Sequence, residues 1–409
     1  DISNSLKNSK KNTFLSNIFK KNVLKNFKHL KNGYIKIVDG NDIYEVGNKS
    51  ESLKCEINIV STDFYVFIGS GGLLGATEAY AAGLWECSDL VTLTRIMVRN
   101  QKLMSYLDSG LAKLLIPINK FIHYTKRNTV LGSKKNIMAH YDLGNDFYKL
   151  WLDKTMTYSC AYFDNNETTL EEASIKKLDM LCKKLKLTKH DSVLEIGTGW
   201  GSFAIHAASN YGCKVTTTTI SNEQYIYTKE LIKKLKLEHL ITLVNKDYRH
   251  LEGTYDKIVS IEMIEAVGHK NVPTYFKIVS NLLKEGGLFA MQGITYNDQK
   301  FDIYKNSVDF INKYIFPGSC LISISQVSDI VKKNTKFDFI DLEDITKHYA
   351  ITLSKWRETF LEKTDEVKKL GFSDTFIRLW EFYLTYCEAG FLEKNIGDYQ
   401  FLFLKQREY

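Results

Sequence analysis

The feature that most constrains this chain is the stretch Val193–Ser202, an apolar run that leads into an acid and a set of glycines. The run predicts a buried strand, and the residues from Phe203 onward predict a helix. Glycines between a strand and a helix let a ligand lie against bare backbone, close to the amides of the helix N-terminus. The stretch therefore predicts a ligand site at the end of a strand.

The spacing of these glycines favours one kind of ligand. Dinucleotide folds space their glycines as G-x-G-x-x-G, but here every second residue is glycine and an acid precedes them. This is closer to an S-adenosylmethionine (SAM) site, where a carboxylate lies near the sulfonium end and no pyrophosphate has to be held. A nucleotide site and a plain strand–helix turn are the alternatives. The residues of this loop are Glu195, Gly197, Thr198, Gly199, Trp200 and Gly201.

From residue 136 onward, predicted helices and strands alternate. Strands are expected at 192–196, 214–219, 241–245, 257–261 and 287–294, and helices at 146–151 and 169–185. Such alternation is typical of an α/β doubly wound sheet, whose ligands bind at the carboxyl ends of the strands. Residues 296–335, with a helix expected over Tyr304–Tyr314, are longer than a connection needs and are interpreted as a lid.

The first part of the chain has a different pattern. Strands are expected at 34–38, 43–46, 55–60 and 64–68, with a hairpin turn at 39–42, and helices from about Thr77 to Lys120. We therefore expect a small α+β domain over residues 1–125 and a catalytic domain over residues 126–409. The polar stretch 124–135 is the expected linker between them.

Two segments of the first domain bear on membranes. Residues 1–31 carry eight lysines against one acid, and their apolar residues recur at helical spacing. A basic amphipathic helix suits the surface of an anionic bilayer; a surface helix packed on its own domain is the alternative. Residues 66–85 are mostly apolar, but Glu78 and clustered glycines predict a loop and a helix within the protein rather than a bilayer span.

Composition limits the compartment and the partners. The net charge of +7 fits an anionic lipid surface or nucleic acid, and it fits solubility equally well. The seven cysteines are scattered without close pairs, which argues against a disulfide framework and against a zinc site. We therefore expect a reducing cytoplasm and no metal.

Polar residues follow the second and third predicted strands. Many SAM enzymes place an acid for the ribose hydroxyls after the second strand, where this chain has Thr219, Ile220 and Ser221, with Gln224 in the next helix. Hydroxyls and an amide can do the same work, but a strand end with a helix cap explains them equally well. Asp247 and Tyr248 follow the third strand and suit the adenine amine and ring; Asp247 as a helix cap is the alternative.

Further polar residues follow the fourth and fifth strands. Glu262 and Glu265 share one face if their segment is helical, and one of them is a candidate for a buried acid near the donor; surface carboxylates are the alternative. Gln292 and Ile294 end a run that should be mostly buried, where a polar side chain needs a partner.

Residues 141–148 and 157–163 are unusually dense in aromatic and polar groups. A sulfonium cation gains about 0.5–2 kcal/mol from an aromatic face when it is desolvated, so Tyr158 and its neighbour Ser159 are candidates for the SAM site. Cys160 is either a small packed side chain or a reactive thiol, and Cys387 has the same ambiguity.

Taken together, these segments resemble the cyclopropane-fatty-acyl-phospholipid synthase family, which includes the mycolic acid cyclopropane synthases. The resemblance rests on residues 71–80, 83–85, 140–146, 158–162, 195–201 and 313–317. It implies a Rossmann-like class I SAM-dependent methyltransferase domain with a helical lid insertion, preceded by a small α+β domain that docks on lipid. The implied reaction transfers a methylene from SAM to the cis double bond of a phospholipid acyl chain.

The resemblance also implies roles for the site residues. Tyr158, Ser159, the glycine loop, Thr219–Gln224 and Asp247–Tyr248 would hold SAM. In the family a bicarbonate ion acts as the base, and the ligands that match are Cys160, Glu265, Gln292, Ile294 and Tyr349. Position 292 is a departure, because the family has a histidine there and an amide cannot carry charge or relay a proton. The family's carboxy-terminal cysteine matches Cys387.

An unsaturated phospholipid in an anionic membrane surface is the implied partner. Withdrawing about nine methylenes into water would cost roughly 7 kcal/mol at about 0.8 each, so an apolar channel that touches the bilayer is expected. We therefore expect a cytoplasmic protein, peripherally associated with the inner face of the membrane, without a nucleic-acid partner; a homodimer is an open alternative. The rival functions are a methyltransferase that leaves a methyl or methylene branch, one that methylates a small amine, and a non-catalytic lipid-binding relative.

Overall fold

The computed structural model describes residues 13–101, 103 and 143–407. The chain forms two compact units. The first, called here the small unit, contains residues 1–122, 308–311 and 353–395. The second, the large unit, contains residues 123–307, 312–352 and 396–409. The expected linker at 124–135 and the motif residues 140–142 lie outside the described residues.

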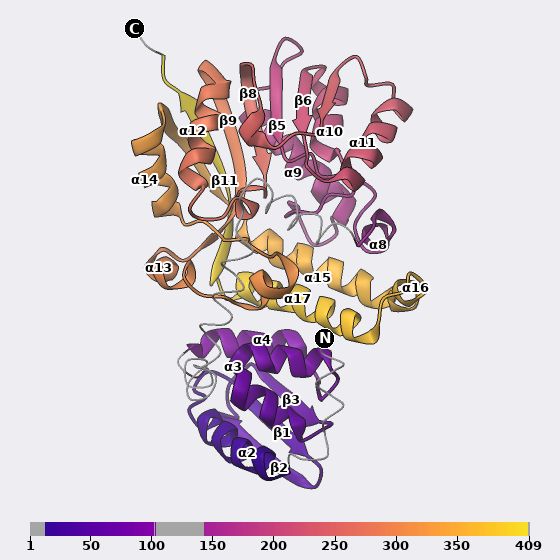
Figure 1. The fold of residues 1–409 in the computed structure, drawn as a ribbon, viewed down its shortest axis with the longest axis vertical. Helices are drawn as coiled ribbons and strands as arrows, with labels where there is room; N and C mark the ends of the chain where they lie inside the picture. The colour runs from indigo at the N-terminus through magenta and orange to yellow at the C-terminus, as the bar shows by residue number, and fades with distance from the viewer. Residues whose placement is uncertain (1–12, 102, 104–142, 408–409) are drawn as a thin grey trace. The chain divides into compact units, whose positions relative to one another are not determined.

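The small unit contains a four-stranded sheet in the order β2-β1-β3-β4 (Figure 1). β1 pairs antiparallel with β2 through the hairpin predicted at 39–42, and parallel with β3. The three longer strands match the predictions for residues 34–60. The strands are β1 Tyr34–Asp39, β2 Asp42–Gly47, β3 Lys54–Ile59 and β4 Trp85–Cys87, and the helices are α2 Thr13–Phe27, α3 Asp63–Ala81, α4 Leu90–Arg99, α16 Thr364–Lys369 and α17 Asp374–Leu392.

Several apolar residues of helix α2 are buried within the small unit. Phe19, Val23 and Phe27 are buried, and Lys20 forms an ion pair with Asp39 of β1 at 2.6 Å. This is the arrangement of a surface helix packed on its own domain, the alternative to a membrane-surface helix.

The strand predicted at residues 64–68 is wrong, because these residues form the first turns of α3. Phe64, Tyr65 and Ile68 are buried along one face of that helix, a spacing that an apolar run does not distinguish from a buried strand. The glycines at 69–72 also lie within α3, which kinks at Gly72 (φ 59°, ψ −137°). Within the described part of the chain, no helix is both long enough and apolar enough to cross a bilayer.

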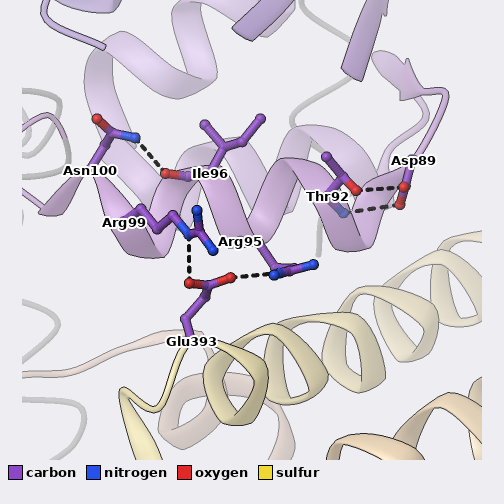
Figure 2. A network of polar contacts seen from close by, with 7 residues as sticks. All are labelled: Asp89, Thr92, Arg95, Ile96, Arg99, Asn100 and Glu393. Carbon is purple, nitrogen blue, oxygen red and sulfur yellow. Dashed lines mark hydrogen bonds and ion pairs between the residues drawn. The ribbon is translucent and has the colours of Figure 1, made fainter. Parts of the chain in front are cut away.

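The carboxy-terminal helix α17 belongs to the small unit. Glu393, directly after the helix, accepts hydrogen bonds from the Nε atoms of Arg95 and Arg99 on α4, each at 2.6 Å (Figure 2). Arg378 on α17 donates to the carbonyl oxygens of Tyr80 and Trp85 at 2.7 and 2.8 Å. The boundary expected at residue 125 lies outside the described residues and stays a prediction, but residues 353–395 group with the small unit rather than with the catalytic domain.

The large unit is built on a seven-stranded sheet in the order β10-β11-β9-β8-β5-β6-β7, with helices along both sides (Figure 1). All five strands predicted for this domain are present. The strands are β5 Ser192–Ile196, β6 Lys214–Thr218, β7 Ile241–Val244, β8 Tyr255–Ile261, β9 Leu283–Tyr296, β10 Phe337–Asp344 and β11 Ile396–Lys405, and the helices are α8 Asn145–Lys149, α9 Leu170–Lys184, α10 Ser202–Tyr211, α11 Asn222–Lys234, α12 Val272–Leu282, α13 Phe301–Tyr304 and α14 Ile324–Asn334. Helix α15, Thr346–Glu362, begins in this unit.

Strand residues alternate between two hydrophobic cores, one on each face of the sheet. Leu194 and Phe289 belong to the core that includes α12 and α14. Their neighbours Val193 and Leu288 belong to the core that includes α9 and α10. Burial on both faces explains why the central strands read as continuous apolar runs.

Two features of this unit differ from the prediction. The helix expected over Tyr304–Tyr314 is wrong, because α13 ends at Tyr304 and a short π-helix covers Ile311–Ile315. The sequence analysis also missed β10 and β11; β11 pairs antiparallel with both β9 and β10. Helices still separate these strands, since α14 precedes β10 and α15 to α17 precede β11.

Strand β5 is the topological switch point of the sheet. It pairs with β6 on one side and with β8 on the other, so the chain leaves β5 in one direction and later returns to its opposite side. Ligands of open α/β sheets bind at the carboxyl ends of the strands beside such a point. The glycine loop follows β5 and lies at this position.

Candidate active site

Backbone geometry explains the glycine loop. Gly197 and Gly201 have φ values of 100° and 90°, which residues with a side chain rarely adopt. A Cβ on Gly201 would lie 2.7 Å from Cγ2 of Thr228. The amides of Gly197 and Thr198 donate to the carbonyl of Thr218 at 3.1 and 2.9 Å, which fixes the loop to the end of β6.

Glu195 at the end of β5 is a buried carboxyl with one described hydroxyl donor. The residue is 2% exposed, and its Oε2 accepts from Oγ1 of Thr217 at 2.6 Å. Burial raises the pKa of Glu195 to about 8, although the Thr217 hydrogen bond and the charge of Lys177 oppose the shift. A cation bound nearby would favour the ionised form, so the position suits the cationic end of SAM.

An aromatic cluster is built around Tyr148 beside this loop. Its ring centroid lies 4.8 Å from that of Trp200 and 5.5 Å from that of Tyr158. Nε1 of Trp200 donates to Asn145 at 2.7 Å, which holds the indole in place. The predicted SAM residues Tyr158 and Trp200 are therefore brought together by Tyr148.

The polar residues after β6 form hydrogen bonds with one another. Oγ1 of Thr219 donates to Oε1 of Gln224 at 2.9 Å, and Ser221 caps α11 by accepting from the amide of Gln224 at 3.3 Å. Ile220 between them is half-buried. The helix-cap alternative thus describes Ser221, and the contacts of this group with SAM stay predictions.

The residues after β7 are also bonded locally. The Asp247 carboxylate accepts from the backbone amide, Nε and Nη2 of Arg249 at 3.0, 2.8 and 2.7 Å. Burial raises its pKa, but these hydrogen bonds outweigh burial and hold the pKa below its usual range. Tyr248 contacts the buried Tyr275 edge-on, with ring centroids 5.4 Å apart. Asp247 therefore acts as a cap, and its role toward adenine stays a prediction.

A second group of polar residues surrounds the carboxylate of Glu262, directly after β8. Its Oε1 accepts from the backbone amide of Cys160 and from Nε2 of Gln292, both at 2.8 Å. Its Oε2 accepts from the hydroxyl of Tyr349 on α15 at 2.5 Å. From the sequence, Glu262 was a candidate buried acid, whereas the resemblance implied the role of bicarbonate ligand for Glu265.

Gln292 and Asp398 lie on neighbouring strands behind this carboxylate, and neither has exposed surface. Nε2 of Gln292 also donates to Oδ2 of Asp398 at 3.2 Å, and Oε1 of Gln292 accepts from Gln400 at 3.1 Å. The partner expected for a buried polar side chain at position 292 is therefore found.

Lys177 is the cation of this cluster among the described residues, and the sequence analysis missed it. The residue has no exposed surface, and its Nζ donates to Oγ of Ser159 at 2.7 Å. It occupies the buried face of α9 together with Ala173, Leu178 and Leu181. A lysine within an apolar helical stripe was the available signal. Asp398 was missed because β11 was not predicted.

Glu265 is held separately. Its Oε1 accepts from the amide of Ile294 at 2.6 Å, and its buried Oε2 has no hydrogen-bond partner among the described residues. Burial and the nearby charge of Glu262 raise the pKa of Glu265 to about 8. Its carboxyl is therefore neutral at pH 7.

The buried thiol of Cys160 is not poised for nucleophilic chemistry. Burial and the charges of Asp398 and Glu262 raise its pKa well above the usual value, and a nucleophilic cysteine needs its thiolate. Cys387 lies on α17 in the small unit, and burial likewise raises the pKa of its thiol. Its role stays a prediction.

The predicted bicarbonate ligands lie together in the large unit, but four of the five already donate to carboxylates, and the neutral carboxyl of Glu265 is the one that keeps an unengaged oxygen among the described residues. Cys160, Gln292 and Tyr349 donate to Glu262, and the amide of Ile294 donates to Glu265. A bound anion needs donors of its own, because a buried charge without hydrogen bonds is costly. The residues present therefore do not fit a bicarbonate ion in this arrangement.

Comparison with known proteins agrees with this fold. Residues 130–401 match the family model described as mycolic acid cyclopropane synthetase. Cyclopropane-fatty-acyl-phospholipid synthase of Escherichia coli (strain K12) is 35% identical over 359 residues, which cover 86% of this chain and 88% of that protein. Tuberculostearic acid methyltransferase UfaA1 of Mycobacterium tuberculosis is 34% identical over 357 residues, which cover 83% of this chain and 80% of that protein.

Solved structures give the same result. The crystal structure of mycolic acid cyclopropane synthase CmaA1, complexed with SAH and CTAB, superposes with a TM-score of 0.62 at 30% sequence identity, covering 66% of this chain and 97% of that chain. The seven-stranded sheet, with its glycine loop at the switch point, is the class I SAM-dependent methyltransferase fold that the sequence predicted. The chain therefore belongs to the mycolic acid cyclopropane synthetase family and is a SAM-dependent methyltransferase.

Proposed function

We propose that this chain transfers a methylene from SAM to the cis double bond of an unsaturated acyl chain in a phospholipid. The observation that carries the proposal is the buried polar cluster around Glu262, at the end of the strand beside the glycine loop. The cluster supplies a carboxylate for an acceptor that must give up a proton from carbon.

The chemistry of an alkene explains this requirement. A double bond is a poor nucleophile, so the donor methyl must be presented in line and the carbocation that forms must be stabilised. The cation is discharged when the added carbon loses a proton, which requires a base within reach. Amines and hydroxyls release a proton from nitrogen or oxygen to water far more readily.

The small unit is the proposed docking domain. On α2, Lys21 and Lys25 are exposed, as is Lys28 just beyond it, and the side chain of Ile18 is 49% exposed on the same helix. Such a surface suits peripheral binding to anionic lipid at the inner face of the cytoplasmic membrane. Vesicle sedimentation should show binding that requires anionic lipid and weakens with salt; equal binding to zwitterionic vesicles would contradict this part of the proposal.

A methyl- or methylene-branched product is the second candidate. Gln292 stands where the resemblance implies a histidine, and one similar protein is named a tuberculostearic acid methyltransferase. Ring closure and branching start from the same carbocation and differ in which carbon loses the proton, so the placement of the base decides between them.

The deciding experiment is incubation with SAM and vesicles of unsaturated phospholipid, followed by mass spectrometry of the acyl chains. We expect a gain of one CH2 that resists hydrogenation. A methylene branch would be hydrogenated and would favour the second candidate. Unchanged lipid with a methylated amine would overturn the lipid proposal, and absence of SAM binding by calorimetry would instead favour a non-catalytic lipid-binding protein.

A further inference from the structure

Hydrogen-bond donors converge on one carboxylate of this site, that of Glu262. Three donors from three segments of the chain meet at one carboxylate: the Cys160 amide, the Gln292 side-chain amide and the Tyr349 hydroxyl, at 2.8, 2.8 and 2.5 Å from Glu262. This inference rests on the function proposed above. A carboxylate that accepts several hydrogen bonds is held in one orientation and favoured in its charged form.

The backbone at Glu262 is strained in order to place this side chain. Its φ is 47°, a left-handed conformation that costs about 1–2 kcal/mol for a residue with a Cβ. Lys186, Lys236 and Lys394 also have positive φ, but each lies two residues beyond the end of a helix, where this conformation is a common cap. Glu262 instead follows a strand, and strain of this kind concentrates at functional sites.

Gln292 is oriented toward Glu262 by its own partners. Its carbonyl oxygen accepts from Gln400 at 3.1 Å, which directs its NH2 group to Glu262 at 2.8 Å and to Asp398 at 3.2 Å. One side chain thus supplies a hydrogen bond to each of two carboxyl groups. This accounts for a glutamine at a position where the resemblance implies a histidine.

The surrounding charges favour Glu262 as the ionised acid of the cluster. Lys177, which has no exposed surface, attracts its charge. Burial and the charge of Glu262 raise the pKa of Asp398 well above its usual value, and they raise that of Glu265 to about 8. Burial also raises the pKa of Glu262, which brings it closer to the working pH of a general base.

Accessibility separates Glu262 from the residues that support it. Glu262 is half-buried, whereas Lys177, Gln292 and Asp398 have no exposed surface. The supporting residues are therefore dry, whereas Glu262 keeps some exposed surface. A dry surrounding strengthens the hydrogen bonds and charges that hold the carboxylate.

We propose that the Glu262 carboxylate is the general base of this enzyme and stands in place of a bound anion. A C–H bond of the added methyl group breaks, its electron pair closes the C–C bond of the ring, and the proton passes to Glu262. The carbocation is thereby neutralised and the ring is complete. The proton then leaves to solvent before the next turnover.

The first test is Glu262→Gln, which keeps the shape of the side chain and removes the base. Turnover of unsaturated phospholipid should fall by about 10²- to 10⁴-fold, the usual contribution of a general base, while calorimetry shows unchanged SAM affinity. Glu238→Gln, the same change at an exposed residue of the large unit, should behave as wild type. Near-normal turnover of Glu262→Gln, or a larger loss in Glu265→Gln, would overturn the assignment.

The second test is chemical rescue of Glu262→Gly, since glycine tolerates the left-handed backbone and frees the three donors. Added formate or bicarbonate should restore part of its turnover, whereas wild-type turnover should be the same in bicarbonate-free buffer and with added bicarbonate. A wild type that needs bicarbonate would overturn the inference while leaving the proposed function in place. A wild type that binds SAM but yields no lipid product in either buffer would overturn the proposed function, and this inference with it.

Discussion

The two ends of the active site are assembled in different ways. The donor end is local: the glycine loop lies within Glu195–Gly201, and backbone amides and φ angles form much of it. The base end gathers side chains from α9, β9, β11 and α15 and from the segments after Met156 and after β8. A site formed by neighbouring residues can be predicted from a short motif. A site formed by residues distant in sequence depends on strand pairing and on buried charge.

Replacing Lys177 should have the largest effect and tests whether the base end depends on buried charge. Lys177→Met removes the donor to Oγ of Ser159 and the positive charge near the buried carboxyl groups, and leaving a buried polar group without its partner typically lowers the free energy of unfolding by about 1–3 kcal/mol. Lys176→Met is the matched control, since Lys176 is exposed and its ion pair with Asp164 is worth about 0–1 kcal/mol. Denaturant unfolding measures both variants. Equal losses would show that the base end does not depend on buried charge.

Tyr349→Phe is a smaller change at the base end. The change removes one donor to Glu262, and a hydrogen bond to a charged group is worth about 1.5–3 kcal/mol. We expect kcat to fall by about tenfold to a hundredfold, at 1.4 kcal/mol per tenfold, with SAM affinity unchanged in calorimetry. A loss of SAM affinity without loss of kcat would move Tyr349 to the donor end.

The donor end is tested by two alanine substitutions. Gly201→Ala brings a Cβ to 2.7 Å from Thr228 in a left-handed backbone, and we expect a loss of about 1–3 kcal/mol in the free energy of unfolding. Gly199→Ala meets nothing within 4 Å, so it should cost less stability and mainly weaken SAM binding. Thermal unfolding with and without SAM separates the two effects. A larger loss of stability in Gly199→Ala than in Gly201→Ala would show that Gly199, not Gly201, is packed.

The smallest expected effect is a pH slope. Glu195 holds its proton up to a pKa of about 8 in the folded protein but releases it near 4.5 when unfolded. The unfolded chain therefore binds fewer protons in this interval, and stability falls as pH rises from about 5 to 8. Glu195→Gln should flatten this slope in part, because Glu265 contributes in the same direction. An unchanged slope of Tm against pH would place the pKa of Glu195 elsewhere.

Sequence patterns predicted the strand, loop and helix at β5 and α10, for physical reasons. An apolar run with glycines after it positions β5, its loop and α10 through local preferences alone, and the structure shows that helix α9 begins at a capping box formed by Thr169 and Glu172. The strand prediction for Phe64–Ile68 was wrong because a short apolar run fits a strand and a buried helix equally well. The hydrogen bonds that converge on Glu262 show where such patterns end, because they depend on which donors reach that carboxylate across the fold.

The pairing of Gln292 with Gln400, directly opposite each other in β9 and β11, has a consequence for biosynthesis. β11 is the last strand in sequence order, yet it inserts between β9 and β10 and brings Gln400 and Asp398 to the base. A growing chain therefore completes the donor loop long before it completes the base. A chain released before residue 396 would lack the partners that orient Gln292, so it would have a place for SAM without the means to finish the reaction.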